Sequence, residues 1–121
     1  MRILITGSRD WPDRDTIAGA LLNATKDIPQ NPEPVTVITG ACPSGADKMA
    51  EDVAEFMEWN IETYPANWKE YGKAAGPIRN KFMVDNGADI CLAFIKDNSK
   101  GASGTADMAE QAGILTVRHH L

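Results

Sequence analysis

The sequence predicts an α/β fold, a Rossmann-like three-layer sandwich with about five parallel strands in the order 3-2-1-4-5. Short apolar runs alternate about four times with segments of helical periodicity, and this alternation is typical of a parallel sheet with right-handed crossover helices on both faces. The clearest runs have no polar interruption, as expected for strands that are buried on both sides. A chain of 121 residues leaves no room for a second core of comparable size, so we predict one domain over residues 1–121.

The first strand and helix follow from the apolar pattern near the N-terminus. Residues 2–6 predict a buried strand, because three consecutive aliphatic residues precede Gly7. Residues 12–28 predict a helix, because apolar side chains recur every three or four positions and Pro12 suits a first helical turn. The proline-rich segment 29–34 cannot continue a helix, so we expect a surface loop there.

The middle of the chain contains the second and third predicted strands. Residues 35–39 are mostly β-branched and predict the second strand. An amphipathic helix is expected over residues 46–57, and Trp59 at its end is expected to cover core. A weaker strand is expected over residues 60–64, followed by a long polar loop over residues 65–77.

The last third of the chain completes the alternation. A helix is expected over residues 77–86, and residues 89–95 form the most apolar predicted strand of the sequence. A loop over residues 96–103 then leads into a short helix over residues 104–112. The last strand is expected over residues 114–118.

Composition excludes some classes of partner. Apolar residues make up 43% of the chain and charged residues 24%, with a formal net charge of −5, which is ordinary for a globular protein. The acidic balance argues against a nucleic-acid polymer as partner, because such binding needs a basic face. A small anionic ligand is still compatible, since backbone N–H groups and one or two arginines can hold a phosphate.

The sequence offers no signal for a membrane, a cofactor or a metal. The apolar run at the N-terminus is too short for a signal peptide, and no segment approaches the ~20 apolar residues of a membrane span. Cys42 and Cys91 lack metal-binding spacing, and we expect two reduced thiols in a cytoplasmic protein. His119 and His120 lie at the C-terminus, where we expect fraying and at most adventitious metal binding.

The turns after the predicted strands contain small, hydroxyl and charged residues directly before helices. In an open parallel sheet these turns meet in a crevice beyond the carboxyl ends of the strands, where helix N-termini favour anions. We therefore expect one crevice for a nucleotide or another phosphorylated sugar. The candidate residues in these turns are Gly7, Ser8, Arg9, Asp10, Trp11, Gly40, Gly45, Asp47, Gly101, Ser103, Gly104 and Thr105.

Each of these candidates also has a purely structural interpretation. The glycines can serve positive φ angles or close packing, and Ser8 and Asp47 can cap or solvate helix starts. The turn from Gly101 to Thr105 is the strongest candidate for a phosphate cradle, because two glycines and two hydroxyls precede the predicted helix. It is not a Walker motif, and no turn matches the dinucleotide fingerprint.

Several longer side chains could complete such a site. Arg79 near the start of a helix can hold a phosphate or carboxylate through a bidentate fork, or form a surface ion pair. Asn80 can contact a sugar hydroxyl or cap the helix. Arg9 has the same two interpretations as Arg79, with Asp10 as its ion-pair partner. Three aromatic side chains near this edge can stack on a base or clamp a loop: Trp11, Trp68 and Tyr71.

Motifs along nearly the whole chain resemble the YspA/YpsA-related branch of the SLOG superfamily, in the same order. They are residues 3–11 (ILITGSRDW), 39–47 (TGACPSGAD), 66–80 (ANWKEYGKAAGPIRN), Met83 and Gly104-Thr105. The resemblance implies a small Rossmannoid domain of bacterial or phage type that binds nucleotides or nucleotide-derived signals such as ADP-ribose relatives. It also implies a possible homodimer.

The wider superfamily includes the Lonely Guy phosphoribohydrolases, marked by an arginine followed by a Pro-Gly-Gly-x-Gly-Thr-x-x-Glu turn. Arg79 resembles that arginine, and Gly104-Thr105 resemble the Gly-Thr pair. Met108 stands at the glutamate position, so the acid–base group implied by the resemblance is missing there. Asp107 or Glu110 could replace it only if the helix were rotated.

Three functions remain open from the sequence. The first is binding of a nucleotide or nucleotide-derived ligand as a sensor or sequestering domain. The second is a nucleoside-monophosphate phosphoribohydrolase, with Arg79, Asp107 and Glu110 as candidate catalytic residues. The third is a phage or bacterial interaction module without a small ligand.

Overall fold

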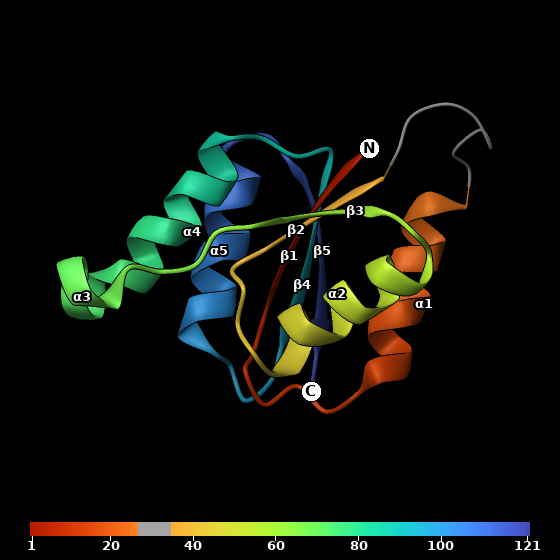
Figure 1. Cartoon of the computed structure of the whole chain (residues 1–121), viewed down its shortest axis with the longest axis horizontal. Helices are drawn as coiled ribbons and strands as arrows, with labels where there is room; N and C mark the ends of the chain where they lie inside the picture. The colour runs from red at the N-terminus through yellow and green to blue at the C-terminus, as the bar shows by residue number, and fades with distance from the viewer. Residues whose placement is uncertain (27–34) are drawn as a thin grey trace.

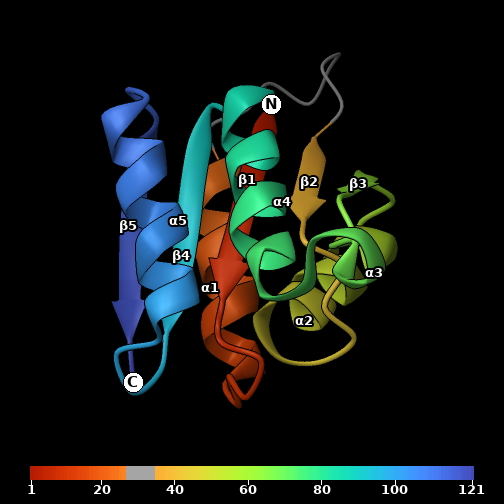
Figure 2. The same ribbon diagram turned by 90° about the vertical axis from the view of Figure 1, so that its left-hand side faces the viewer.

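The computed structural model describes residues 1–26 and 35–121 and contains a five-stranded, all-parallel sheet. The strand order is β3-β2-β1-β4-β5, which confirms the predicted fold class and strand order (Figure 2). The predicted loop over residues 29–34 and the end of the predicted first helix lie outside the described residues. The strands are β1 (Arg2–Gly7), β2 (Thr36–Thr39), β3 (Asn60–Thr63), β4 (Ile90–Ile95) and β5 (Leu115–His120).

Helices cover both faces of the sheet and make the expected three layers (Figure 1). On one face lie α1 (Arg14–Thr25) and α2 (Gly45–Phe56). On the other face lie α4 (Ala75–Asp85) and α5 (Lys100–Gln111). The four-residue α3 (Trp68–Tyr71) and the 3-10 turn η1 (Gly72–Ala74) connect β3 to α4 and bury no residue.

The core divides by strand alternation. In β1, Ile3 and Ile5 point to the α1/α2 face, whereas Leu4 points to the α4/α5 face, and all three are fully buried. This follows from the two-residue repeat of a strand. Because the apolar sides of helices cover both faces of the sheet, every side chain in the aliphatic run of β1 packs against one of the two helical layers. Trp59 packs against the α1/α2 core, as predicted.

The first helix begins later than its apolar periodicity predicts. Pro12 lies outside the helix, and the prediction of a helix start at residue 12 is wrong. Asp13 is the N-cap, and its carboxylate accepts hydrogen bonds from the Thr16 backbone N–H (3.1 Å) and hydroxyl (2.6 Å). A capping carboxylate at this position fixes the helix start after it.

Three further predictions are corrected at the element ends. The expected loop over residues 65–77 contains α3 and η1, and α4 begins at Ala75 with Pro77 in its first turn. The last helix begins at Lys100 rather than at residue 104. β5 continues to His120, so the C-terminal histidines are not frayed: they pair with β4, and His119 stacks on Phe94 with ring centroids 5.1 Å apart.

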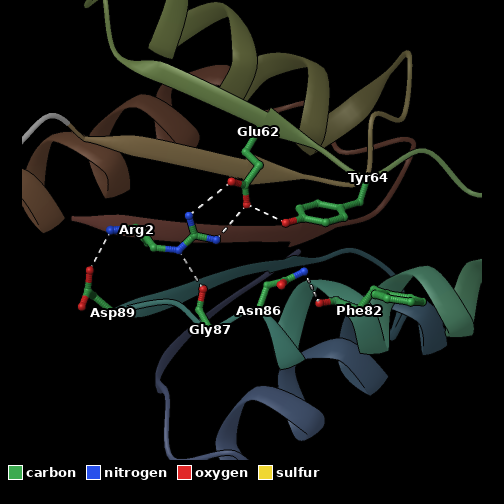
Figure 3. Close-up of polar contacts among 7 residues, drawn as sticks. All are labelled: Arg2, Glu62, Tyr64, Phe82, Asn86, Gly87 and Asp89. Atoms are coloured by element: carbon green, nitrogen blue, oxygen red, sulfur yellow. Dashed lines mark hydrogen bonds and ion pairs between the residues drawn. The ribbon is translucent and has the colours of Figure 1, made fainter.

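A polar network ties the edge strand β3 to the centre of the sheet (Figure 3). The Arg2 guanidinium donates to both carboxylate oxygens of Glu62, at 3.3 and 2.8 Å, and to the Gly87 carbonyl at 3.0 Å. The Tyr64 hydroxyl donates to the same carboxylate at 2.7 Å. These bonds lower the pKa of Glu62, with the Arg2 bond as the largest cause. The network therefore orients Tyr64, which lies beside the crevice described below.

In the described part of the chain, none of the helices has the length and apolar character needed to cross a bilayer.

Candidate ligand-binding site

A cavity lies at the carboxyl ends of β1, β2 and β4, where the sequence predicts the crevice. Its volume is about 740 Å³, within the range of small-molecule sites. Ten of the predicted site residues line it: Gly7, Ser8, Arg9, Asp10, Gly40, Asp47, Trp68, Arg79, Asn80 and Gly101. The fold thus brings together segments from four different turns, while ligand binding by these residues stays a prediction.

Arg79 is the most firmly positioned cation of the crevice. Its Nη1 donates to the Gly40 carbonyl at 2.6 Å and to the Tyr64 carbonyl at 3.4 Å, and its Nε donates to the Asn80 side-chain oxygen at 2.6 Å. Burial lowers its pKa, whereas the nearby Asp47 carboxylate favours its charged form. Within the described residues, the hydrogen bonds of Arg79 use Nε and Nη1, which leaves Nη2 as a donor for a ligand.

Gly40 is required by the position of Arg79. A Cβ atom at residue 40 would overlap Nη1 of Arg79 and lie 2.7 Å from its Cζ. The guanidinium therefore packs directly on the backbone at the end of β2. Glycine is therefore needed at residue 40 because a side chain approaches its backbone closely, and not because the backbone needs a positive φ angle.

Asp47 holds the loop between β2 and α2. One of its carboxylate oxygens accepts the backbone N–H groups of Gly40 and Cys42, each at 3.2 Å. Between them Ala41 has a φ of 60°, a region that costs energy for a residue with a Cβ. The buried carboxylate thus stabilises a strained loop conformation that forms one wall of the crevice.

The ionisation of Asp47 is strongly affected by this environment. Burial raises the pKa of its carboxyl to about 6, and nearby Glu51 raises it further. The two backbone N–H groups and Arg79 act in the opposite direction. Asp47 is therefore the carboxyl group of the crevice that titrates closest to neutral pH among the described residues for which a shift is resolved.

The first turn is anchored to the end of β4. The Ser8 hydroxyl accepts the Lys96 backbone N–H at 2.9 Å, and Asp10 forms an ion pair with the Lys96 ammonium at 3.0 Å. The expected pair of Asp10 with Arg9 is therefore wrong. Gly45 has a φ of 70°, and a Cβ there would overlap the Ser8 carbonyl, so the start of α2 touches this turn directly.

Arg9 and Trp68 face each other across the mouth of the crevice. The Arg9 guanidinium lies 5.8 Å from the Trp68 ring centroid, a cation–π distance. Arg9 is exposed and is close enough to Arg79 to oppose its charge. Two guanidinium groups thus share one cavity, an arrangement that attracts anions.

The N-terminus of α5 supplies a third positive feature. Ser99, Gly101 and Ala102 line the crevice, and the Ser99 side chain makes no capping hydrogen bond. The first helical bond runs from the Ser103 N–H to the Ser99 carbonyl at 3.1 Å. The earlier N–H groups of this helix end point along the axis toward the crevice, where they favour an anion.

The expected phosphate cradle from Gly101 to Thr105 is not a turn. These residues form the first turns of α5, and the Thr105 hydroxyl is fully buried and donates to the Gly101 carbonyl at 3.1 Å. Ser103, Gly104 and Thr105 do not line the crevice. Sequence reasoning missed Ser99, whose residue type at a helix start is a capping signal.

Trp11 does not take part in the crevice. It is buried in the α1/α2 core, packs edge-on against Phe94 at 5.4 Å and donates its indole N–H to the Asp13 carbonyl. The interpretation of Trp11 as a base-stacking residue is therefore wrong. Trp68 is half exposed and lines the crevice, so it remains a candidate for stacking on a base.

The candidate catalytic carboxylates point elsewhere. Asp107 and Glu110 both pair with Arg118, at 2.7 and 2.9 Å, and neither lines the crevice. Met108 packs into the core on the α4/α5 face. Within residues 1–26 and 35–121, no group of three histidine, cysteine, aspartate or glutamate side chains could hold a metal ion.

Two comparisons relate this chain to known proteins. The family model described as the YspA, cpYpsA-related SLOG family matches residues 1–71, which include the first two turns of the crevice. The chain is also similar to the Gene 61 protein of Mycobacterium phage D29, with 36% identity over 125 positions that cover 96% of this chain and 94% of the phage protein. No solved structure gives a significant match.

Proposed function

Because this chain belongs to the YspA, cpYpsA-related SLOG family, we propose that its crevice binds a nucleotide or a nucleotide-derived ligand such as ADP-ribose. The family makes the chain a nucleotide-related Rossmannoid domain. Binding of such a ligand would make the protein a sensor or a sequestering domain for a nucleotide signal.

The observation that carries the proposal is the convergence of three positive features in one cavity. Arg79 contributes its Nη2 donor, and Arg9 contributes an exposed guanidinium at the mouth. The N-terminus of α5, which has no side-chain cap, also lines the cavity. Each of these features alone is a common surface motif. Together they form a concave site with positive potential. The chain as a whole has a net charge of −5, so a phosphate would be attracted by these local groups and not by the overall charge.

The contacts favour binding over hydrolysis of an N-glycosidic bond. A hydrolase of this kind needs a carboxyl group within hydrogen-bond reach of the ribose. Asp107 and Glu110 instead pair with Arg118, and Asp47 uses its carboxylate to hold the backbone of residues 40–42.

Calorimetric titration of the protein with AMP, ADP, ATP and ADP-ribose tests the proposal. We expect at least one of these to bind in the micromolar range and Arg79→Gln to weaken it by about tenfold or more, because a charge-assisted hydrogen bond to phosphate contributes about 1.5–3 kcal/mol. Arg14→Gln is the matched control, since Arg14 pairs with Asp52 away from the crevice and its loss should leave affinity unchanged.

Two results would contradict the proposal. One is the absence of heat and of thermal stabilisation with all four nucleotides. The other is binding that Arg79→Gln and Arg14→Gln weaken equally, which would indicate a non-specific charge effect. Base release from AMP by the wild-type protein would instead revive the hydrolase alternative.

A further inference from the structure

A second, smaller hollow adjoins the crevice on the far side of Arg79. Its volume is about 240 Å³, roughly a third of that of the crevice. It lies between the end of β3, α3 and α4. Its walls are mainly apolar and include Tyr64, Tyr71, Ile78 and Phe82.

The aromatic side chains of this hollow are unusually exposed. Tyr71 on α3 is 45% exposed and Phe82 on α4 is 61% exposed. Tyr64 is held at the hollow by its bond to Glu62, which Arg2 fixes in turn. Figure 3 shows Tyr64 at the end of β3 and Phe82 on α4 at the same end of this face. A concave apolar surface bordered by aromatic rings suits a flat ring system.

The hollow and the crevice are adjacent and share part of their walls. Arg79 and Pro65 line both of them, and the Arg79 guanidinium bonds to the Tyr64 carbonyl at their junction. Arg79 is thus the residue that a ligand occupying both cavities would contact from either side. The opposite side of the crevice offers Trp68, but Arg9 already lies over that ring.

We propose that this hollow of Tyr64, Tyr71, Ile78 and Phe82 is the subsite for the base of the nucleotide whose phosphate lies in the crevice. The inference rests on the function proposed above and adds where the base binds. The base would lie against both Tyr71 and Phe82, and the ribose would lie beside Arg79 and Pro65. A nucleoside phosphate is then selected over a simple sugar phosphate by aromatic contact.

A second copy of the chain fits the hollow less well than a base. A stable interface buries about 800 Å² on each partner, whereas apart from Trp68 on α3 the other large exposed apolar side chains in the described residues lie on or directly after α1, α2, β3 and β5. The shared wall with an anion site also favours a ligand that carries both a charge and a ring.

The test compares a ligand that has a base with one that lacks it. Calorimetry is run with AMP and with ribose 5-phosphate on the wild-type protein, Tyr71→Ala, Phe82→Ala and Trp68→Ala. We expect Tyr71→Ala and Phe82→Ala to weaken AMP by about tenfold, the loss implied by one base–aromatic stack, and to leave ribose 5-phosphate unchanged. Phe56→Ala is the matched control, because Phe56 is an exposed aromatic at the end of α2.

The outcomes separate this inference from the proposed function. If the wild-type protein binds AMP and ribose 5-phosphate equally, or if only Trp68→Ala weakens AMP selectively, the crevice still binds phosphate but the hollow is not the base subsite. Equal weakening of both ligands by Phe82→Ala also overturns the inference. If ADP-ribose binds but AMP and ribose 5-phosphate do not, the hollow is not a base subsite for nucleoside monophosphates and the inference fails. If none of the three binds, the proposed function fails with it.

Discussion

At the scale of single residues, the crevice depends on a few groups that serve structure and site together. Gly40 leaves room for the Arg79 guanidinium, and Arg79 in turn bonds to the Gly40 carbonyl. Asp47 holds the same loop from the other side through two backbone N–H groups. A ligand that meets Arg79 therefore meets a loop whose shape is already set, which lowers the ordering cost of binding.

The raised pKa of Asp47 predicts a pH dependence of stability. The folded pKa of about 6 lies above the ordinary value of 3.8, so the folded state holds this proton more tightly between these pH values. The stability contribution is fully present below pH ~4 and is lost as the pH rises through ~6. Asp47→Asn keeps an acceptor for Gly40 and Cys42 without the charge, and should remove this part of the pH dependence.

Chemical denaturation of both proteins at pH 4 and pH 7 checks the prediction. Between pH 4 and pH 7, the free energy of unfolding of Asp47→Asn should rise by on the order of 2 kcal/mol relative to that of the wild type, because each pKa unit corresponds to about 1.4 kcal/mol. Asp15→Asn, at an exposed carboxyl in the first turn of α1, is the control and should show no such gain. Parallel pH curves for wild type and Asp47→Asn would show that Asp47 does not titrate in this range.

At the scale of elements, the start of α5 decides which residues reach the ligand. Because the helix begins at Lys100, its uncapped end presents Gly101 and Ala102 to the crevice and removes Gly104 from it. The helix therefore contributes its dipole and its first N–H groups rather than a glycine-rich loop. The same shift turns Thr105 inward, where its hydroxyl bonds within the helix.

Gly104→Ala tests this assignment. A Cβ at residue 104 would meet nothing within 4 Å, and alanine favours a helix over glycine by about 1 kcal/mol. We expect a higher melting temperature and unchanged nucleotide affinity. Gly19→Ala in α1, where a Cβ also meets nothing, is the control for the helix effect alone. Weaker nucleotide binding by Gly104→Ala without a loss of stability would restore the predicted cradle at this turn.

At the scale of the whole molecule, the most stable part of the fold is the centre of the sheet. Ile3, Leu4 and Ile5 of β1 and the apolar run of β4 are buried under helices on both sides. By contrast, α3 and η1 bury no residue and project beyond α4 (Figure 1). The rigid floor of the crevice is thus formed by the sheet, and one side of its mouth by the least buried helical segment.

Native-state hydrogen exchange should show this gradient directly. Amides of β1 and β4 should exchange only through global unfolding, whereas those of α3 and η1 should exchange through local opening at much lower free energy. Saturating nucleotide should slow exchange in α3 more than in α1, because Trp68 and Tyr71 border the proposed subsites. Equal protection of α3 and β1 in the free protein would contradict this prediction.

Much of the fold could be predicted from the sequence because strands and helices have distinct local patterns of apolar residues. Uninterrupted aliphatic runs such as residues 3–5 identify strands that are covered on both faces, and their alternation with helical segments predicts a parallel sheet. The same pattern places the turns at one edge, which is why Gly7, Gly40, Arg79 and Gly101 line one cavity. Element ends were predicted less well: a cap such as Asp13 competes with apolar periodicity, and α5 begins at Lys100 without a side-chain cap that would mark its start.

The sequence by itself therefore determined the layers and the edge of the sheet where the crevice lies, since these follow from hydrophobic period and chain direction. The predicted strand order is confirmed by the structure, although local patterns do not specify it. Only the tertiary structure decided which side chains enter the crevice. Trp11 turns into the core against Phe94, Asp107 and Glu110 turn to Arg118, and Arg79 packs on Gly40. The physical reason is that the direction of a side chain in a turn or on a helix is set by partners on other elements of the fold, and a local sequence pattern carries no information about them.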